Sequence, residues 1–248
     1  MSDAIPICIA GMHRSGTSMV AKLLHLCGLY LGQKQDLMPP APDNPDGFWE
    51  NMKFMKLNDE ILNELGGGWD CPPPISGRWD EERLLRLQAR AEAVLQEFSG
   101  HEPWGWKDPR NSLILPFCKS LFPKVKVVLC LRNPLEVALS LHRRNYFSYA
   151  LSLTLWRAHN QRILDSTLPE QRIITHYDVY FHDLRAELRR VLDFLRIPVS
   201  EDLIEQCRSS AKLDLRHHRF TAQHLLAANV SADIFNLYVR MCTEAGWR

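Results

Sequence analysis

The chain has 248 residues, of which 46% are hydrophobic and 24% charged, and its formal net charge is +1. These values are typical of a globular protein with a hydrophobic core, and so small a net charge does not favour nucleic acid as a partner. No apolar run approaches the length of a membrane span, and the first residues lack the features of a secretory signal. The seven cysteines include no CxxC pair, so we expect free thiols, a cytoplasmic location and no metal site.

The first predicted elements are a strand, a turn and a helix. Residues 5–10 form a short apolar run, which predicts a buried strand. A glycine-rich turn follows at 11–18, and apolar residues spaced along 20–27 predict a helix with one buried stripe. The chain therefore begins with a strand–loop–helix unit.

The next part of the chain alternates loops and helices. Residues 33–48 contain four prolines and predict a long loop, after which a helix is expected to begin near 48–50 and to continue through 61. Residues 66–80 carry three consecutive glycines and three consecutive prolines, which predict a second irregular stretch. The apolar spacing along 84–98 then predicts another helix.

Two later apolar runs, at 127–131 and 173–175, predict further strands, and the stripe along 184–195 predicts a helix. Strands that alternate with helices indicate an α/β fold whose mostly parallel sheet is covered by helices on both faces. With no repeat or low-complexity segment in the sequence, we expect residues 1–248 to form one domain.

The turn at 11–18 has part of the spacing of a phosphate-binding loop. Gly11, Gly16 and Ser18 occupy the expected positions, but Thr17 stands where a nucleotide kinase has lysine, and the positive charge lies earlier, at Arg14. Backbone N–H groups of such a loop still suit a 5′-phosphate. The turn therefore predicts a site for one phosphate without magnesium, although a tight strand–helix turn without a ligand has the same pattern.

A second anion site is predicted where the 127–131 strand ends. Arg132 follows this strand, Asn133 suits a helix N-cap and Pro134 the first helical turn. Ser140 lies about two turns into that helix, close to two further arginines at 143–144. A capped surface helix is the alternative interpretation. Because ligands of α/β proteins bind at strand carboxyl ends, the two sites together favour a nucleotide with phosphates at its 5′ and 3′ ends.

Three ordered blocks carry a family resemblance. Residues 14–18 (Arg-Ser-Gly-Thr-Ser) and 132–140 resemble the two nucleotide-binding segments of sulfotransferases that use 3′-phosphoadenosine 5′-phosphosulfate (PAPS). Residues 106–109 (Trp-Lys-Asp-Pro) resemble a block of the tyrosylprotein sulfotransferases and of bacterial sulfotransferase-like proteins, and 44–50 is similar to the bacterial group. The resemblance spans about residues 5–145 and weakens afterwards. It implies a P-loop nucleotide-kinase-like fold.

The resemblance also implies a nucleotide co-substrate, PAPS, bound without metal. The residues that it assigns to nucleotide binding are Arg14, Ser15, Gly16, Thr17, Ser18, Arg132 and Ser140, with Arg216 closing over the nucleotide from the later part of the chain. A short basic run such as that around Arg216 is also typical of a solvated surface.

Three residues are candidates for catalysis. The guanidinium of Arg14 suits stabilisation of the departing phosphate. The resemblance places Lys107 beside the transferred group, and the alternative for Lys107 is an ion pair with Asp108 or with a nearby acid. Glu50 is the predicted general base because it ends the proline-rich loop. Other candidates for the base are His13, Asp46 and His101.

The sequence leaves the acceptor unidentified. A glycan, a lipid or a small metabolite is expected, with peptide tyrosine as a further option, and the 33–48 and 66–80 loops are expected to select it. Two other functions remain open at this point: a P-loop kinase that uses ATP, and a nucleotide-binding module without activity. The sequence gives no prediction of oligomeric state.

Overall fold

A parallel sheet of four strands organises the residues described by the computed structural model, which are 5–74, 80–210 and 220–247. The strands are β1 (Ile7–Ala10), β2 (Gly105–Lys107), β3 (Lys126–Leu131) and β4 (Arg172–His176), in the order β2-β1-β3-β4. Ile7 pairs with Gly105 on one side and with Lys126 on the other, and every neighbouring pair is parallel. All four strands therefore end at the same edge of the sheet.

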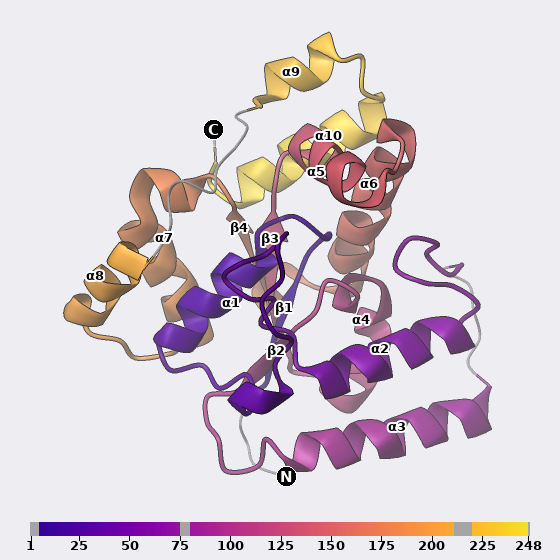
Figure 1. The fold of residues 1–248 in the computed structure, drawn as a ribbon, viewed down its shortest axis with the longest axis vertical. Helices are drawn as coiled ribbons and strands as arrows, with labels where there is room; N and C mark the ends of the chain where they lie inside the picture. The colour runs from indigo at the N-terminus through magenta and orange to yellow at the C-terminus, as the bar shows by residue number, and fades with distance from the viewer. Residues whose placement is uncertain (1–4, 75–79, 211–219, 248) are drawn as a thin grey trace.

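Helices connect the strands and cover the sheet (Figure 1). They are α1 (Thr17–Leu26), α2 (Met52–Glu64), α3 (Glu81–Gln96), α4 (Asn111–Leu121), α5 (Pro134–Asn145), α6 (Tyr149–Ser166), α7 (Val179–Leu195), α8 (Glu201–Ser210), α9 (Ala222–Ala227) and α10 (Ala232–Glu244), with short 3-10 turns η1 (Lys34–Asp36) and η2 (Pro169–Gln171). Within the described part of the chain, no helix is both long enough and apolar enough to cross a membrane.

Alternate residues of the strands face two separate hydrophobic cores. Ile7 and Ile9 of β1 pack with buried residues of α1, α7 and α8, whereas Cys8 and Ala10 pack with those of α2, α4, α6 and α10. Figure 1 shows the first group of helices on one side of the sheet and the second on the other. This arrangement confirms the predicted α/β fold with helices on both faces.

The structure differs from the prediction at one helix start and at one strand near the site. The helix expected to begin near 48–50 begins at Met52, because Asn51 caps it by accepting a hydrogen bond from the Lys53 amide at 2.9 Å and Trp49 has a left-handed φ of 60°. Strand β2 has three residues, of which Trp106 and Lys107 belong to the Trp-Lys-Asp-Pro block, and no strand was predicted there. Its residues lack an apolar run, so pairing with β1 rather than local pattern defines it.

Candidate active site

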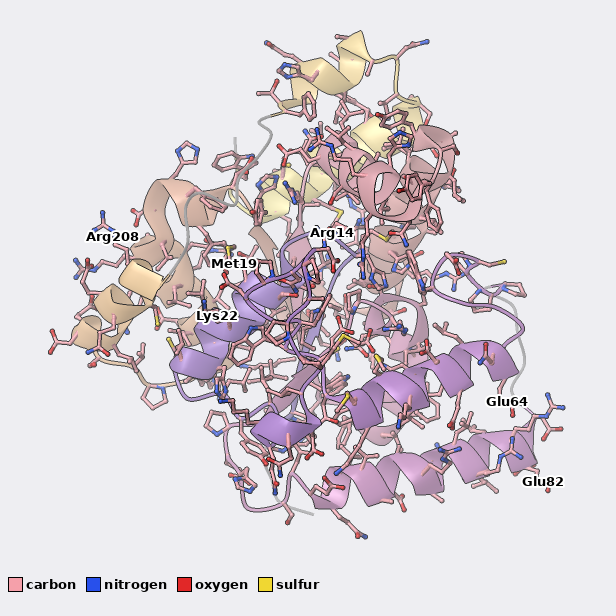
Figure 2. The ribbon with its side chains drawn as sticks, viewed as in Figure 1. Arg14, Met19, Lys22, Glu64, Glu82 and Arg208 are labelled. Atoms are coloured by element: carbon pink, nitrogen blue, oxygen red, sulfur yellow. The ribbon has the colours of Figure 1, made fainter. Side chains whose placement is uncertain are left out.

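The carboxyl ends of all four strands meet at one cavity of about 380 Å³. The 11–18 loop follows β1, Lys107 ends β2, Arg132 follows β3 and Tyr177 follows β4, and each contributes to the cavity wall. Figure 2 shows Arg14 at the centre of the molecule, whereas Glu64, Glu82 and Arg208 lie at its periphery. The sheet therefore brings both predicted anion sites and Lys107 to a single place.

Two glycines give the 11–18 loop its shape. A Cβ on Gly11 would lie 2.5 Å from the carbonyl oxygen of Cys130, and one on Gly16, whose φ is 87°, would lie 2.4 Å from Cδ2 of Tyr177. Neither position accepts a side chain without displacement. The loop consequently turns tightly into α1, whose first N–H groups have no partner within the helix and suit an anion.

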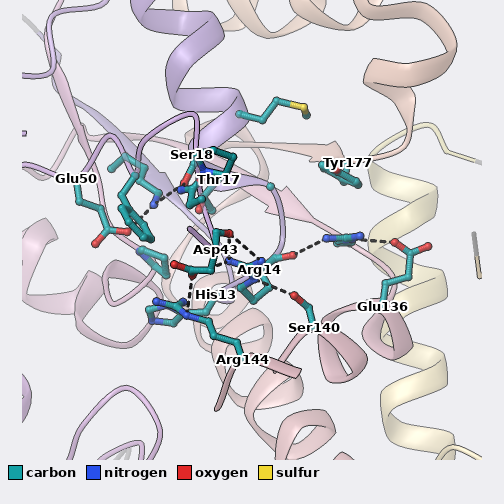
Figure 3. A pocket seen from close by; sticks show the side chains of 18 of the residues that line it. His13, Arg14, Thr17, Ser18, Asp43, Glu50, Glu136, Ser140, Arg144 and Tyr177 are labelled. Carbon is teal, nitrogen blue, oxygen red and sulfur yellow. Dashed lines mark hydrogen bonds and ion pairs between the residues drawn. The ribbon is translucent and has the colours of Figure 1, made fainter. Parts of the chain in front are cut away.

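The side chain of Arg14 spans from the loop to α5. Its Nε donates to Oγ of Ser140 at 2.8 Å, and its Nη1 lies 3.4 Å from Oδ2 of Asp43 in the proline-rich loop (Figure 3). Burial lowers the pKa of the Arg14 guanidinium, and the nearby charge of Arg144 lowers it further. Ser140 therefore contacts Arg14, and Arg132 has other partners.

Arg132 is held on three sides. Its Nε lies 2.8 Å from a carboxylate oxygen of Glu136, and its Nη1 donates to the carbonyl oxygen of Arg14 at 3.1 Å. Its guanidinium also lies over the ring of Tyr177, 4.4 Å from the ring centre. Asn133 caps α5 through the amide of Leu135, as its sequence position predicted. These contacts fix the cation beside the N-terminus of α5.

Lys107 forms a buried ion pair with Glu50. Its Nζ lies 2.6 Å from Oε1 of Glu50 and 3.3 Å from Oγ of Ser18. Only 2% of Lys107 and 5% of Glu50 are exposed, and Nη1 of Arg110 lies 3.7 Å from the second oxygen of Glu50. The predicted base and the second predicted cation thus lie against the start of α1.

Asp108, the predicted alternative partner of Lys107, has other contacts. Nη1 of Arg110 lies 3.1 Å from its carboxylate, and Asn58 donates to it at 3.0 Å. Burial, with the charge of Glu50 second, raises the pKa of Asp108 to about 6. The structure therefore pairs Lys107 with Glu50 and leaves Asp108 to position Arg110.

Comparison with known proteins gives this arrangement a family. The model of the sulfotransferase family matches residues 6–201, which is most of the chain. The chain belongs to the sulfotransferase family. Among curated proteins, a putative protein-tyrosine sulfotransferase of Caenorhabditis elegans is 25% identical over 129 residues, which are 48% of this chain and 50% of that protein. The match thus spans about half the length of this relative.

Solved sulfotransferase structures share the fold. The sulfotransferase domain of the Synechococcus PCC 7002 olefin synthase has 18% identity and a TM-score of 0.58, and covers 97% of this chain and 94% of its own. The sulfotransferase domain of the curacin biosynthetic pathway has 14% identity and a TM-score of 0.59, with coverage of 100% and 99%. At these identities the likeness shows the fold alone.

The other predicted residues of this sulfotransferase are scattered. His13 lines the cavity. Its pKa is well below the usual range, mainly because the ring is buried and secondly because of the charge of His159. Among the described residues that line the cavity, neither Asp46 nor His101 is found: Asp46 lies 3.7 Å from Lys22, and His101 stacks on Tyr30. The Ser15 side chain is buried outside the cavity wall. Arg216 lies outside the described residues.

No site role was predicted from the sequence for several cavity residues of this sulfotransferase, among them Tyr177, Glu136 and Asp43. Tyr177 follows β4 as Arg132 follows β3, so the rule on strand ends would have found it. Glu136 lies four residues after Arg132, the spacing of a helical ion pair. Asp43 had no comparable signal, because its partners lie on distant parts of the chain.

Proposed function

We propose that this sulfotransferase transfers a sulfuryl group from PAPS to a hydroxyl or amine group of an acceptor that is a glycan, a lipid or a small metabolite. The single observation that supports this most strongly is the Lys107–Glu50 pair beside Ser18, at 2.6 Å and 3.3 Å, in the cavity that also holds Arg14 and Arg132. A candidate base, Glu50, and several cationic side chains therefore line the same cavity.

The nucleotide half of the proposal rests on the loop and the two arginines. The first amides of α1, with Thr17 and Ser18, suit the 5′-phosphate, and Arg132 beside the N-terminus of α5 suits the 3′-phosphate. Gly16 leaves open a position that a Cβ would occupy against Tyr177. Bound PAPS would supply the activated sulfuryl group, and no residue in this scheme requires a metal ion.

The chemical half assigns roles to the other residues. Glu50 accepts the proton of the acceptor group, whose oxygen or nitrogen forms a bond to sulfur. The bond between sulfur and the 5′-phosphate oxygen breaks, and that oxygen keeps the electron pair. Arg14 and Lys107 stabilise the charge that develops on the phosphate and the sulfuryl oxygens. Removing one such donor is expected to cost about 100- to 1,000-fold in rate.

Two variants separate the halves of this scheme. We expect Arg132→Ala to weaken binding of adenosine 3′,5′-bisphosphate (PAP) by about tenfold or more, because a hydrogen-bonded charge is lost. We expect Glu50→Ala to keep PAP binding and to lower sulfuryl transfer by about 100-fold or more. Asp46→Asn is a matched carboxylate control in the same loop, since Asp46 lies outside the cavity lining.

The assay follows labelled sulfuryl from PAPS to a panel of sugars, lipids, phenols and amines, with transfer to water counted as well. Normal transfer by Glu50→Ala would show that Glu50 is not the base. Unchanged PAP affinity in Arg132→Ala would show that the proposed nucleotide site is wrong.

Acceptor selection is proposed to lie in two loops. Asp43, Pro45 and Phe48 of the proline-rich loop line the cavity. Trp69, in the described part of the 66–80 loop, lies 4.3 Å from the His13 ring, measured between ring centres. The proline-rich loop therefore forms part of the cavity wall, and Trp69 of the second loop contacts His13, a residue of that wall.

A further inference from the structure

Two buried cysteines meet between α1 and α8. Sγ of Cys27 lies 3.7 Å from Sγ of Cys207, and the two residues are 180 positions apart in the chain. Cys27 is the C-cap of α1, and Cys207 lies within α8. Only 4% of Cys27 and 1% of Cys207 are exposed. The fold therefore brings two thiols from distant parts of the chain into direct contact.

The contact between the sulfur atoms is more specific than core packing requires. Buried cysteine commonly packs as a small hydrophobic residue, and both cysteines belong to the core that also holds Leu24 and Ile204. Here, however, the two thiols are hydrogen-bond partners of each other. Because a disulfide bond is about 2.05 Å long, the sulfur atoms are less than about 2 Å from bonding distance.

Helix α8 is the element whose movement exposes this pair. In residues 201–208, only Ile204 and Cys207 are buried. The helix packs on α7 and α1, and Figure 1 shows it at the edge of the molecule. Glu201 pairs with Arg185 of α7 at 2.7 Å, but exposed ion pairs contribute little stability. An element with so few buried residues is expected to open locally without global unfolding.

The packed state keeps the pair slow to react. Burial raises the pKa of the Cys27 thiol to about 12, with the charge of Cys207 second, and burial also raises the pKa of Cys207. The thiolate that attacks a disulfide is therefore scarce until α8 opens. Reaction at this pair should consequently follow the opening of one peripheral helix.

We infer that Cys27 and Cys207 form a reversible redox site, and that their disulfide bond fastens α8 to α1. The oxidant class is a low-molecular-weight disulfide, such as oxidised glutathione. The thiolate of one cysteine attacks this reagent, forms a mixed disulfide and releases one thiol; the second cysteine attacks the mixed disulfide and releases the other. The two cysteines lose two electrons and two protons, which the reagent gains as its two thiols.

This redox site is separate from the cavity. Helix α1 has ten residues, from Thr17 at the cavity wall to Leu26, so Cys27 lies about 15 Å along the axis from the start of the helix. Neither cysteine lines the cavity. The inference therefore goes beyond the proposed function and does not rest on it.

The test uses the Cys71→Ser variant, because an exposed thiol at Cys71 would form a simple adduct. The protein is incubated with excess oxidised glutathione in urea below the start of the unfolding transition, where α8 opens locally, and is digested without reduction. Mass spectrometry should find the Cys27 and Cys207 peptides cross-linked, lighter by about 2 Da than the two peptides together because two hydrogen atoms are lost. Dithiothreitol should restore both thiols.

Two further variants in the same background are controls. Cys27→Ser should form no cross-link and should end with a glutathione adduct on Cys207. Cys118→Ala removes another buried cysteine, on α4, and should leave the cross-link unchanged. The cross-linked protein should also unfold at about 1 M higher urea than its reduced form, because the bond closes a loop of 180 positions in the unfolded chain.

Three results would overturn the inference. The first is the absence of the Cys27–Cys207 cross-link under these conditions. The second is a similar yield of cross-links to the other buried cysteines, since an unfolded chain would pair its thiols without preference. The third is a cross-linked protein that unfolds at no higher urea than its reduced form, since the bond would then not fasten α8. These measurements involve no nucleotide, so a failure to bind PAP would contradict the proposed function alone.

Discussion

Replacing Lys107 by methionine leaves the Glu50 carboxylate buried without its strongest partner. The lost contact is 2.6 Å long, and the two side chains are only 2% and 7% exposed, so solvent screens the pair little. Breaking a buried ion pair from one side costs about 3–5 kcal/mol. Because Arg110 still lies 3.7 Å from Glu50, we expect Lys107→Met to lower the free energy of unfolding by about 3 kcal/mol, the lower end of that range.

A double-mutant cycle isolates the interaction. Glu50→Gln alone leaves a buried ammonium group and is expected to cost about 2 kcal/mol, whereas the double variant buries no unpaired charge of this pair. The cost of the double variant should therefore be about 2–3 kcal/mol smaller than the sum of the single costs. Urea unfolding at pH 7, followed by circular dichroism, measures all four proteins. Costs that add to within about 0.5 kcal/mol would show that Lys107 and Glu50 do not stabilise each other, because independent sites behave in that way.

Three further predictions concern the surroundings of the site. Gly16→Ala should cost about 1–3 kcal/mol in urea unfolding and weaken PAP binding, since its Cβ would meet Tyr177 at 2.4 Å; unchanged PAP affinity would contradict this. Burial lowers the pKa of His159 to about 4, so the unfolded chain takes up the proton at a higher pH than the folded protein. The free energy of unfolding should therefore fall by up to about 3 kcal/mol as the pH falls from 6.5 to 4. His159→Gln should remove that loss, and an unchanged pH profile would count against it. All seven cysteines lie in the described residues, and Cys71 is the one that is exposed. One thiol per chain should therefore react rapidly with a thiol reagent, and no thiol of the Cys71→Ser variant should do so.

Local signals explain what could be predicted from the sequence. The apolar runs before Gly11 and Arg132 indicated β1 and β3. The glycine spacing marked the turn from β1 into α1, and an Asn-Pro pair marked the start of the helix after β3. Each of these signals lies within a few consecutive residues of the chain. Because parallel strands end at one edge of the sheet, these local signals were enough to predict that the segments of Arg14 and Arg132 meet, and both arginines line one cavity.

The contacts within the cavity could not be predicted in this way. Glu50 meets Lys107 across 57 positions of the chain and Arg14 meets Ser140 across 126, so only the packed fold decides these partners. Asp108, which is adjacent to Lys107 in the chain, was the one acid named as a partner for Lys107, with a nearby acid left open. In β2, however, successive side chains point to opposite faces, and Asp108 follows directly after Lys107. Asp43 had no signal at all, since an acid in a proline-rich loop is ordinarily a solvated residue.

The proposed use of PAPS is tested most directly by a calorimetric titration of the purified protein with PAP in the absence of metal, alongside a titration with ATP and magnesium. We expect tight binding of PAP and little or no binding of magnesium ATP, because Thr17 stands in the position of the lysine that serves the outer phosphates. Tight binding of magnesium ATP, with none of PAP, would contradict the proposed use of PAPS and favour a kinase.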